Sequence, residues 1–132
     1  FVSGISTEQL ARHYNEAEVA VVPSVYEGFG LPAGEAMACG TPLVSTNGGA
    51  LPEVVGDAGV QVPVKDSDAI AEAVATLLRD KEARAALGEK GRQRIEQRFS
   101  WQRAATQMTD YYWQVINEDL HTGKQTAQQA IA

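Results

Sequence analysis

Residues 19–46 read VAVVPSVYEGFGLPAGEAMACGTPLVST, and this stretch decides the fold. A short β-branched run stops at Pro23, a glycine-rich turn follows, and a second apolar run closes the stretch. Between the two runs, Pro32 suits the first turn of a helix and Gly40 its left-handed exit, so we predict a short helix over 32–39. Apolar strands separated by a helix predict an α/β fold with a parallel sheet covered on both faces.

The same alternation extends to both sides of this stretch. Residues 1–4 (FVSG) read as the end of a strand, and Thr7 can cap a helix over 7–17. Residues 59–64 (GVQVPV) read as a fourth strand, with more polar character than the others. We therefore expect four strands linked by helices.

The second half of the chain is predicted to be helical. Asp66 or Ser67 can cap one amphipathic helix, and residues 80–99 continue as one or two helices whose charges we interpret as a solvated face. Ser100 can cap a last helix with a wide aromatic stripe. Residues 121–132 are polar and lack such a stripe, so we expect one domain over 1–120 and a disordered tail.

Composition excludes several classes of function. The net charge of −6 argues against a nucleic-acid backbone or an anionic lipid as partner. No apolar run is long enough to cross a bilayer, and no signal peptide is visible. The single Cys39 excludes a disulfide framework and favours a reducing, cytoplasmic setting. The chain begins with Phe rather than Met, so we expect a piece of a longer protein.

The glycine-rich turn is predicted to bind a ligand. It follows the carboxyl end of a strand and leads into a helix, where unpaired N–H groups favour an anion such as phosphate. No Lys or Arg lies between Arg12 and Lys65, so a bound anion must rely on backbone amides or on cations from elsewhere. Glu27 and Glu35 flank the turn and suit the hydroxyls of a sugar. The residues thus predict a phosphorylated sugar or a nucleotide as ligand.

Plainer interpretations stand beside this prediction. A glycine-rich turn before a helix is more often a tight connection than a binding site, and residues 48–49 (GG) more often form a plain loop. Tyr26 and Phe29 can be packing residues, and His13 suits a helix surface without metal partners. Ser24 has no histidine in its neighbourhood, so a hydrolase nucleophile is not supported.

Residues 23–55, PSVYEGFGLPAGEAMACGTPLVSTNGGALPEVV, resemble retaining family-4, or group 1, glycosyltransferases of the GT-B fold. The pattern of two glutamates separated by seven residues matches at Glu27 and Glu35, and the similarity continues in order over all but the tail. The resemblance implies a Rossmann-like parallel sheet with helices on both faces. The chain would be the latter part of the C-terminal, donor-binding domain.

The resemblance also implies an activity and a set of site residues. Such enzymes transfer a sugar from a nucleotide-sugar donor to an acceptor hydroxyl with retention, and they need neither a metal nor a cofactor. Glu27 would contact the donor sugar and steady positive charge at the anomeric carbon, and Glu35 would accept bonds from the ribose. Main-chain groups around the turn would approach the sugar and the diphosphate, at Gly28, Phe29, Gly30 and Leu31.

The chain departs from the family pattern in what it lacks. The Arg and Lys that clamp the donor diphosphate lie on the first part of the domain, and the N-terminal domain is missing too. We therefore expect the isolated chain to transfer no sugar. Two strands that would lie between residues 1–4 and 19–24 are also absent, so we expect an exposed sheet edge that is covered by rearranged pairing or by self-association.

Two other function classes stay open. One is a different sugar-phosphate enzyme with the GT-B fold, although a pyridoxal-dependent phosphorylase would need a lysine and none lies in residues 1–64. The other is a non-catalytic module that binds a nucleotide sugar or a protein partner. Turnover by the full-length protein separates an enzyme from a module.

Overall fold

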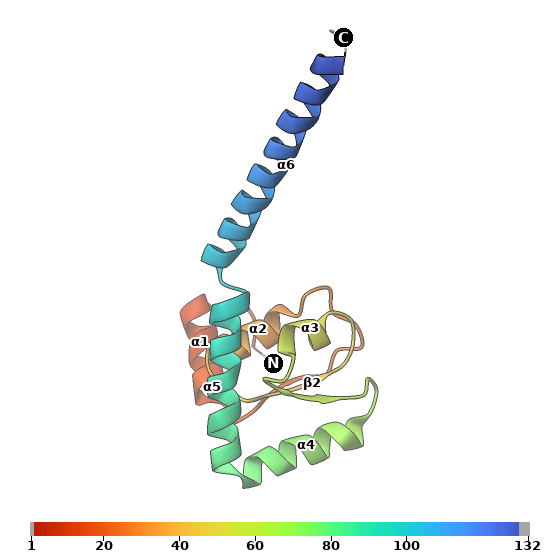
Figure 1. Ribbon diagram of the computed structural model, residues 1–132. Coiled ribbons are helices and arrows are strands. Elements are labelled where there is room, and N and C mark those ends of the chain that lie inside the picture. The colour runs from red at the N-terminus through yellow and green to blue at the C-terminus, as the bar shows by residue number, and fades with distance from the viewer. Residues whose placement is uncertain (1, 130–132) are drawn as a thin grey trace. The chain divides into compact units, whose positions relative to one another are not determined.

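The computed structural model describes the backbone of residues 2–129 and the side chains of residues 2–118. The chain forms two units, Phe1–Gln97 and Arg98–Ala132, and each is described by itself. The first unit is the α/β part, and the second is a single long helix (Figure 1).

The first unit is built on a parallel sheet with the strand order β1-β2-β3. Its strands are β1 (Ala20–Val22), β2 (Leu43–Thr46) and β3 (Val60–Val62). All four residues of the central strand β2 are buried, because both of its neighbours and helices on both sides cover it. This confirms the parallel sheet that the continuous apolar runs predicted.

Helices lie on both faces of this sheet (Figure 1). In chain order they are α1 (Thr7–Glu16), α2 (Leu31–Ala38), α3 (Leu51–Val55), α4 (Ser67–Arg79) and α5 (Lys81–Arg98). Helices α2 and α3 pack on one face, against β1 and β2, whereas α4 packs on the other face, against β2 and β3. The main core lies on the α2 and α3 side, where Val22, Met37, Leu43, Leu51 and Val55 are buried together. The expected helices on both faces are thereby confirmed.

The helix starts follow from local capping groups. Asp66 caps α4 by accepting the Ala69 N–H at 2.9 Å, as the sequence predicted. The cap of α1 was misplaced by one residue, since Ser6 rather than Thr7 caps this helix. Gln9 reaches back to the Ser6 N–H and completes a capping box, a reciprocal pair that Thr7 could not make from inside the helix.

The strand predicted at residues 1–4 is wrong for the described part of this segment, because residues 2–6 form no strand. An extended segment becomes a strand only where a neighbour completes its hydrogen bonds, and Gly4 also turns the chain with a positive φ of 69°. Strand β1 is therefore the edge of the described sheet, and its Val21 is 41% exposed. The expected open edge is confirmed, and no rearranged strand covers it within residues 2–129.

Helix α5 corrects the interpretation of residues 80–99 as a solvated charged face. Its glycines Gly88 and Gly91 are buried, because the helix packs closely on the end of α2. A Cβ at Gly88 would overlap the carbonyl oxygen of Gly40, whereas a Cβ at Gly91 would lie 3.4 Å from the Met37 side chain. The helix is thus a packed element whose charges only partly face water.

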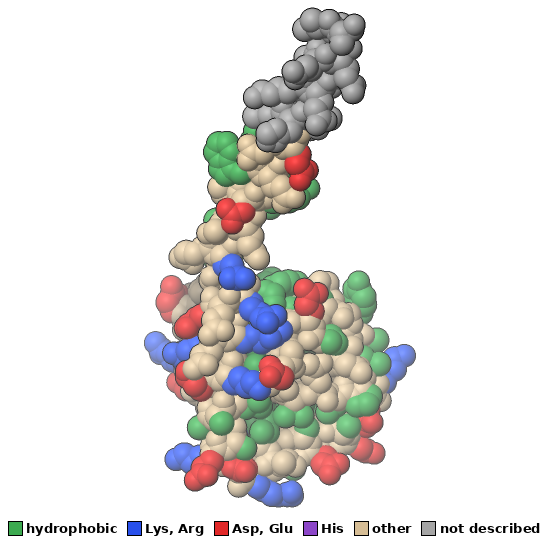
Figure 2. All heavy atoms as spheres, in the orientation of Figure 1, with side chains coloured by type: hydrophobic (Ala, Val, Ile, Leu, Met, Phe, Trp, Pro, Cys, Tyr) green, Lys and Arg blue, Asp and Glu red, His purple; other side chains and the backbone are tan. Residues whose placement is uncertain are grey.

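Two arginines of α5 bind the carboxyl ends of the helices beneath it. Arg92 Nη2 donates to the Cys39 carbonyl at 3.0 Å. Arg94 donates from Nε to the Val54 carbonyl at 2.8 Å and from Nη2 to the Glu53 carbonyl at 2.6 Å. Cations suit these helix ends, whose last carbonyls lack partners within the helix. Figure 2 shows Lys and Arg side chains gathered over α5.

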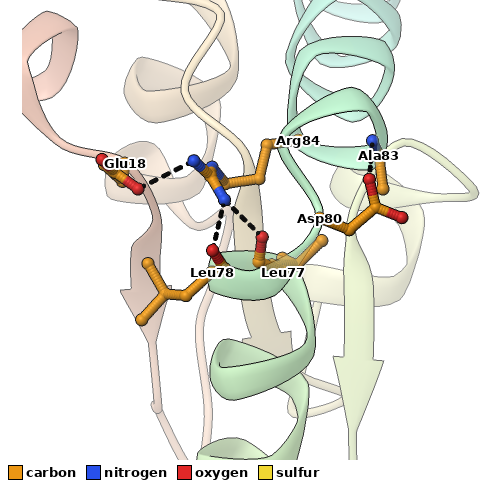
Figure 3. A network of polar contacts seen from close by, with 6 residues as sticks. All are labelled: Glu18, Leu77, Leu78, Asp80, Ala83 and Arg84. Atoms are coloured by element: carbon orange, nitrogen blue, oxygen red, sulfur yellow. Dashed lines mark hydrogen bonds and ion pairs between the residues drawn. The ribbon is translucent and has the colours of Figure 1, made fainter.

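A third arginine joins α4, α5 and the segment before β1 (Figure 3). Arg84 Nη1 donates to the carbonyls of Leu77 and Leu78 at 2.7 Å each, and Nη2 pairs with Glu18 at 2.9 Å. Asp80 caps the start of α5 beside it. The Arg84 side chain is mostly buried whereas that of Glu18 is exposed, so the carbonyl bonds are the better shielded part of this network.

The second unit is helix α6 (Trp101–Gln129). Ser100 accepts the Arg103 N–H at 3.4 Å, which agrees with the predicted cap. The aromatic stripe predicted for this helix is exposed at Trp101, Tyr111 and Tyr112. The backbone of residues 121–129 continues the helix, while residues 130–132 of the predicted tail lie outside the described residues. The disorder of that tail stays a prediction.

No helix in the described part of the chain combines the length and the apolar character needed to span a membrane. Even α6, the longest helix in the described part of the chain, carries polar and charged residues along its length, among them Arg103, Asp110 and Glu118.

The glycines of α5 give a matched test of this packing. We expect Gly88→Ala to lower the free energy of unfolding by about 1–3 kcal/mol, because the backbone of Gly40 cannot yield as a flexible side chain would. We expect Gly91→Ala to raise it by up to about 1 kcal/mol, since Ala is the better helix former and Met37 leaves room. Urea denaturation of both variants measures the difference. Equal effects of the two substitutions would contradict the close approach of α5 to α2.

Candidate functional site

The candidate site lies at the carboxyl edge of the parallel sheet. Residues 23–30 follow β1 and lead into α2, and residues 47–50 follow β2 and lead into α3. Because β1 and β2 are adjacent and parallel, both loops leave the sheet at the same edge. In open α/β sheets this edge is where ligands bind.

The two loops are in direct contact through a pair of glycines. A Cβ at Gly48 would overlap the carbonyl oxygen of Val25, and a Cβ at Gly49 would overlap the backbone of Glu27. The Ala50 N–H donates to the Glu27 carbonyl at 2.9 Å, which closes the contact. Residues 48–49 are therefore not a plain loop, because their missing side chains let the backbone of the first loop rest on them.

The carboxylate of Glu27 is oriented by its own loop. Ser24 Oγ donates to Glu27 Oε1 at 2.7 Å, and the Glu27 side chain is half-buried. The Ser24 carbonyl in turn accepts the hydroxyl of Thr46, at the end of β2. The bond uses Oε1, so Oε2 keeps its own lone pairs for a ligand hydroxyl. The hydroxyl of Ser24 thus orients the Glu27 carboxylate.

The carboxylate of Glu35 is held from a different helix. Glu35 lies on α2 and is exposed, and its Oε2 accepts the hydroxyl of Tyr14 at 3.2 Å. The same hydroxyl lies 3.4 Å from the Pro32 carbonyl in the first turn of α2. Thr41 Oγ1 donates to the Tyr14 carbonyl at 2.7 Å and ties α1 to the end of α2.

This environment changes the acidity of Tyr14. Burial, followed by the negative charge of Glu35 and the bond to it, raises the pKa of Tyr14 from 10 to about 12. Cys39 adds a smaller effect in the same direction. The phenol therefore stays protonated to a higher pH than an ordinary tyrosine and remains a donor to the carboxylate.

The start of α2 is capped without a side chain. Gly30 caps it in the left-handed region, with φ 88° and ψ 49°, and makes no side-chain capping bond. A residue with a side chain would be strained at this φ, which explains the glycine. The side chains of Phe29 and Leu31 are 45% and 64% exposed, and Gly28 is exposed as well. Of the residues predicted to bind the substrate through the turn, Gly28, Phe29 and Leu31 are thus accessible, whereas Gly30 is buried. Their roles stay predictions.

The site is poor in positive charge. Residues 13–64 contain no Lys or Arg, and two arginines of α5, Arg92 and Arg94, bond to the carboxyl ends of α2 and α3, away from the helix starts. Within the described residues, no group of three His, Cys, Asp or Glu side chains is arranged to hold a metal ion. An anionic ligand at this edge therefore meets backbone amides and carboxylates from this chain.

Sequence reasoning found the two glutamates but missed the residues that hold them. Ser24 lies only three residues from Glu27, so a local serine-to-glutamate bond could have been proposed from spacing alone. Tyr14 lies 21 residues before Glu35, and only the packing of α1 on α2 brings the two together. The contact between the two loops was missed as well, although the double glycine at residues 48–49 is the pattern that a close approach of two backbones requires.

Comparisons with known proteins agree with this geometry. Residues 1–94 match the family model described as glycosyl transferases, group 1. A relative from Mycolicibacterium hassiacum, MMP alpha-(1->4)-mannosyltransferase, is 46% identical over 117 residues, which are 86% of this chain and 28% of that protein.

Solved structures of sugar-transferring proteins also match this chain. Sucrose-phosphate synthase from Thermosynechococcus elongatus matches with a TM-score of 0.80 and 42% identity, over 89% of this chain and 30% of that one. The C-terminal domain of a group 1 glycosyl transferase (LpcC) from Francisella tularensis matches with a TM-score of 0.67 and 30% identity, over 76% of this chain and 52% of that one.

The chain spans less than a third of the length of the mannosyltransferase, at 28%, and the matched region belongs to the C-terminal part of such proteins. Its parallel sheet, its two glutamates and its double glycine all lie within or beside the residues that the family model covers. The chain belongs to the group 1 glycosyl transferase family and forms a partial C-terminal region of the GT-B fold.

Proposed function

We propose that this chain is part of the donor-binding domain of a glycosyltransferase that moves a sugar from a nucleotide sugar to an acceptor hydroxyl with retention of configuration. The observation that carries the proposal is the pair of carboxylates at one sheet edge, each fixed at one oxygen by a hydroxyl of the chain. Carboxylates held in this way are preorganised to accept hydroxyl groups of a sugar or a ribose. Family membership and relatives named for sugar transfer support the same conclusion.

The two glutamates take different roles in this proposal. Glu27, which is half-buried in the turn, faces the donor sugar and stabilises positive charge that develops at the anomeric carbon. Glu35, which is exposed on α2, accepts bonds from the ribose of the nucleotide. Backbone groups of Gly28, Phe29, Gly30 and Leu31 approach the sugar and the diphosphate between them.

The donor diphosphate requires positive charge that this chain does not supply near the turn. Residues 13–64 lack Lys and Arg, and Glu27 and Glu35 add negative charge. We propose that an Arg and a Lys elsewhere in the full-length protein balance the diphosphate, without a metal ion or a cofactor. The single free Cys39 suits a reducing setting, which supports a cytoplasmic location for the enzyme.

Substitution of the two glutamates in the full-length protein tests their roles. We expect Glu27→Gln to lower kcat by about 100-fold or more, because it removes charge stabilisation from the transition state. We expect Glu35→Gln to raise the KM for the donor about tenfold with little change in kcat, because ribose binding is equal in the ground and transition states.

A glutamate on the other face of the sheet is the matched control. Glu72 is exposed on α4, and Glu72→Gln removes the same charge without touching either loop. Steady-state kinetics with UDP-glucose and GDP-mannose measure all three variants. Full activity of Glu27→Gln, or an equal loss in Glu72→Gln, would show that the proposed site is wrong.

The isolated chain gives a further test. We expect it to transfer no sugar from any nucleotide sugar, because the cations and the acceptor site lie elsewhere. We also expect its open β1 edge to pair with a second copy, since an unpaired strand edge templates another strand. Transfer assays and sedimentation over a range of concentrations check both properties. Measurable transfer would refute the first, and a strictly monomeric species would refute the second.

A further inference from the structure

We propose that Tyr14 is a positioning residue, which fixes the Glu35 carboxylate for the donor and thereby sets the affinity for the nucleotide. This inference rests on the proposed role of Glu35 in binding the ribose. Tyr14 itself lies on α1, outside the turn and the helix that carry the two glutamates. It therefore acts on the donor through Glu35 and not by direct contact.

The geometry of the hydroxyl shows how it acts. Tyr14 Oη lies 3.2 Å from Glu35 Oε2 and 3.4 Å from the Pro32 carbonyl, one turn earlier on α2. The hydroxyl has one proton, so it can donate to only one of these oxygens at a time. Donation to Glu35 draws the carboxylate back toward the start of α2, where the turn meets the helix.

Glu35 needs such a partner because nothing buries it. An exposed glutamate samples many rotamers, and a ligand that binds it must offset the lost freedom, which costs up to about tenfold in affinity for one long side chain. The bond from Tyr14 restricts the carboxylate before the donor arrives. Preorganisation of this kind raises affinity without a new contact to the ligand.

Tyr14 is itself rigid enough for this task. Its ring packs against the core cluster, and Thr41 Oγ1 donates to its carbonyl at 2.7 Å. The Ala17 N–H donates to the same carbonyl at 3.2 Å and ends α1 there. The core therefore holds the ring of Tyr14, and Thr41, in the segment after α2, holds its backbone.

A titration tests the contact without any donor. Burial, the charge of Glu35, the hydrogen bond to it and, more weakly, Cys39 raise the pKa of Tyr14 to about 12, so its hydroxyl remains mostly protonated at about pH 11. In Glu35→Gln the negative charge is lost, and we expect the pKa of Tyr14 to fall toward 10 while burial keeps it above that value. Ring signals of labelled tyrosine in the nuclear magnetic resonance spectrum follow this change in the isolated chain.

Donor binding then tests the consequence in the full-length protein. We expect Tyr14→Phe, which removes only the hydroxyl, to raise the KM for the nucleotide sugar about three- to tenfold with kcat unchanged. In Tyr14→Phe/Glu35→Gln we expect no loss beyond that of Glu35→Gln alone, because Tyr14 acts through Glu35. Tyr112→Phe, an exposed tyrosine of α6, is the matched control.

The outcomes separate this inference from the proposed function. If the Tyr14 titration does not respond to Glu35→Gln, or if Tyr14→Phe lowers kcat and stability but leaves the donor KM unchanged, Tyr14 is structural and the inference is overturned. If the titration responds but Glu35→Gln leaves the donor KM unchanged, the contact exists and the proposed role of Glu35 fails. Losses in the double variant that multiply would contradict action through Glu35.

Discussion

The close approach of two backbone loops is the constraint on which the rest of the site depends. The glycines at 48–49 carry no side chains, so the loop after β1 can lie directly on the loop after β2. The bond from the Ala50 N–H to the Glu27 carbonyl fixes this contact, and Ser24 then orients the Glu27 carboxylate. A side chain at either glycine would overlap the backbone of the loop after β1 and displace the segment that carries Glu27.

The remaining elements support this edge from the opposite end of the helices. Helices α2 and α3 begin at the site and end beneath α5, where Arg92 and Arg94 bond to their last carbonyls. Gly88 lets α5 approach closely enough for these bonds. The carboxyl ends of both helices are thus covered by arginines, which suits the partial negative charge of a helix end. The arginines of α5 thus stabilise the fold at the carboxyl ends of α2 and α3. The loops at the other ends of these helices contain no Lys or Arg.

The sequence predicted those features that local patterns determine. The turn and helix of residues 23–39 were evident from glycine, proline and apolar runs, and Glu27 and Glu35 stood out because they flank the turn. The strand at residues 1–4 was wrong, because pairing with a neighbour decides whether an extended segment becomes a strand. The partners of Glu35 and of Gly88 could not be predicted, since they lie 21 and more residues away and meet only after packing.

Hydrogen exchange of the full-length protein, with and without UDP-sugars and GDP-sugars, tests most directly whether the two interlocked loops form the donor site. The account predicts that a bound nucleotide sugar slows exchange in residues 24–31 and 48–51 together, while α4 on the other face of the sheet is unchanged. Protection that is confined to other parts of the protein, with these two segments unaffected, would contradict it.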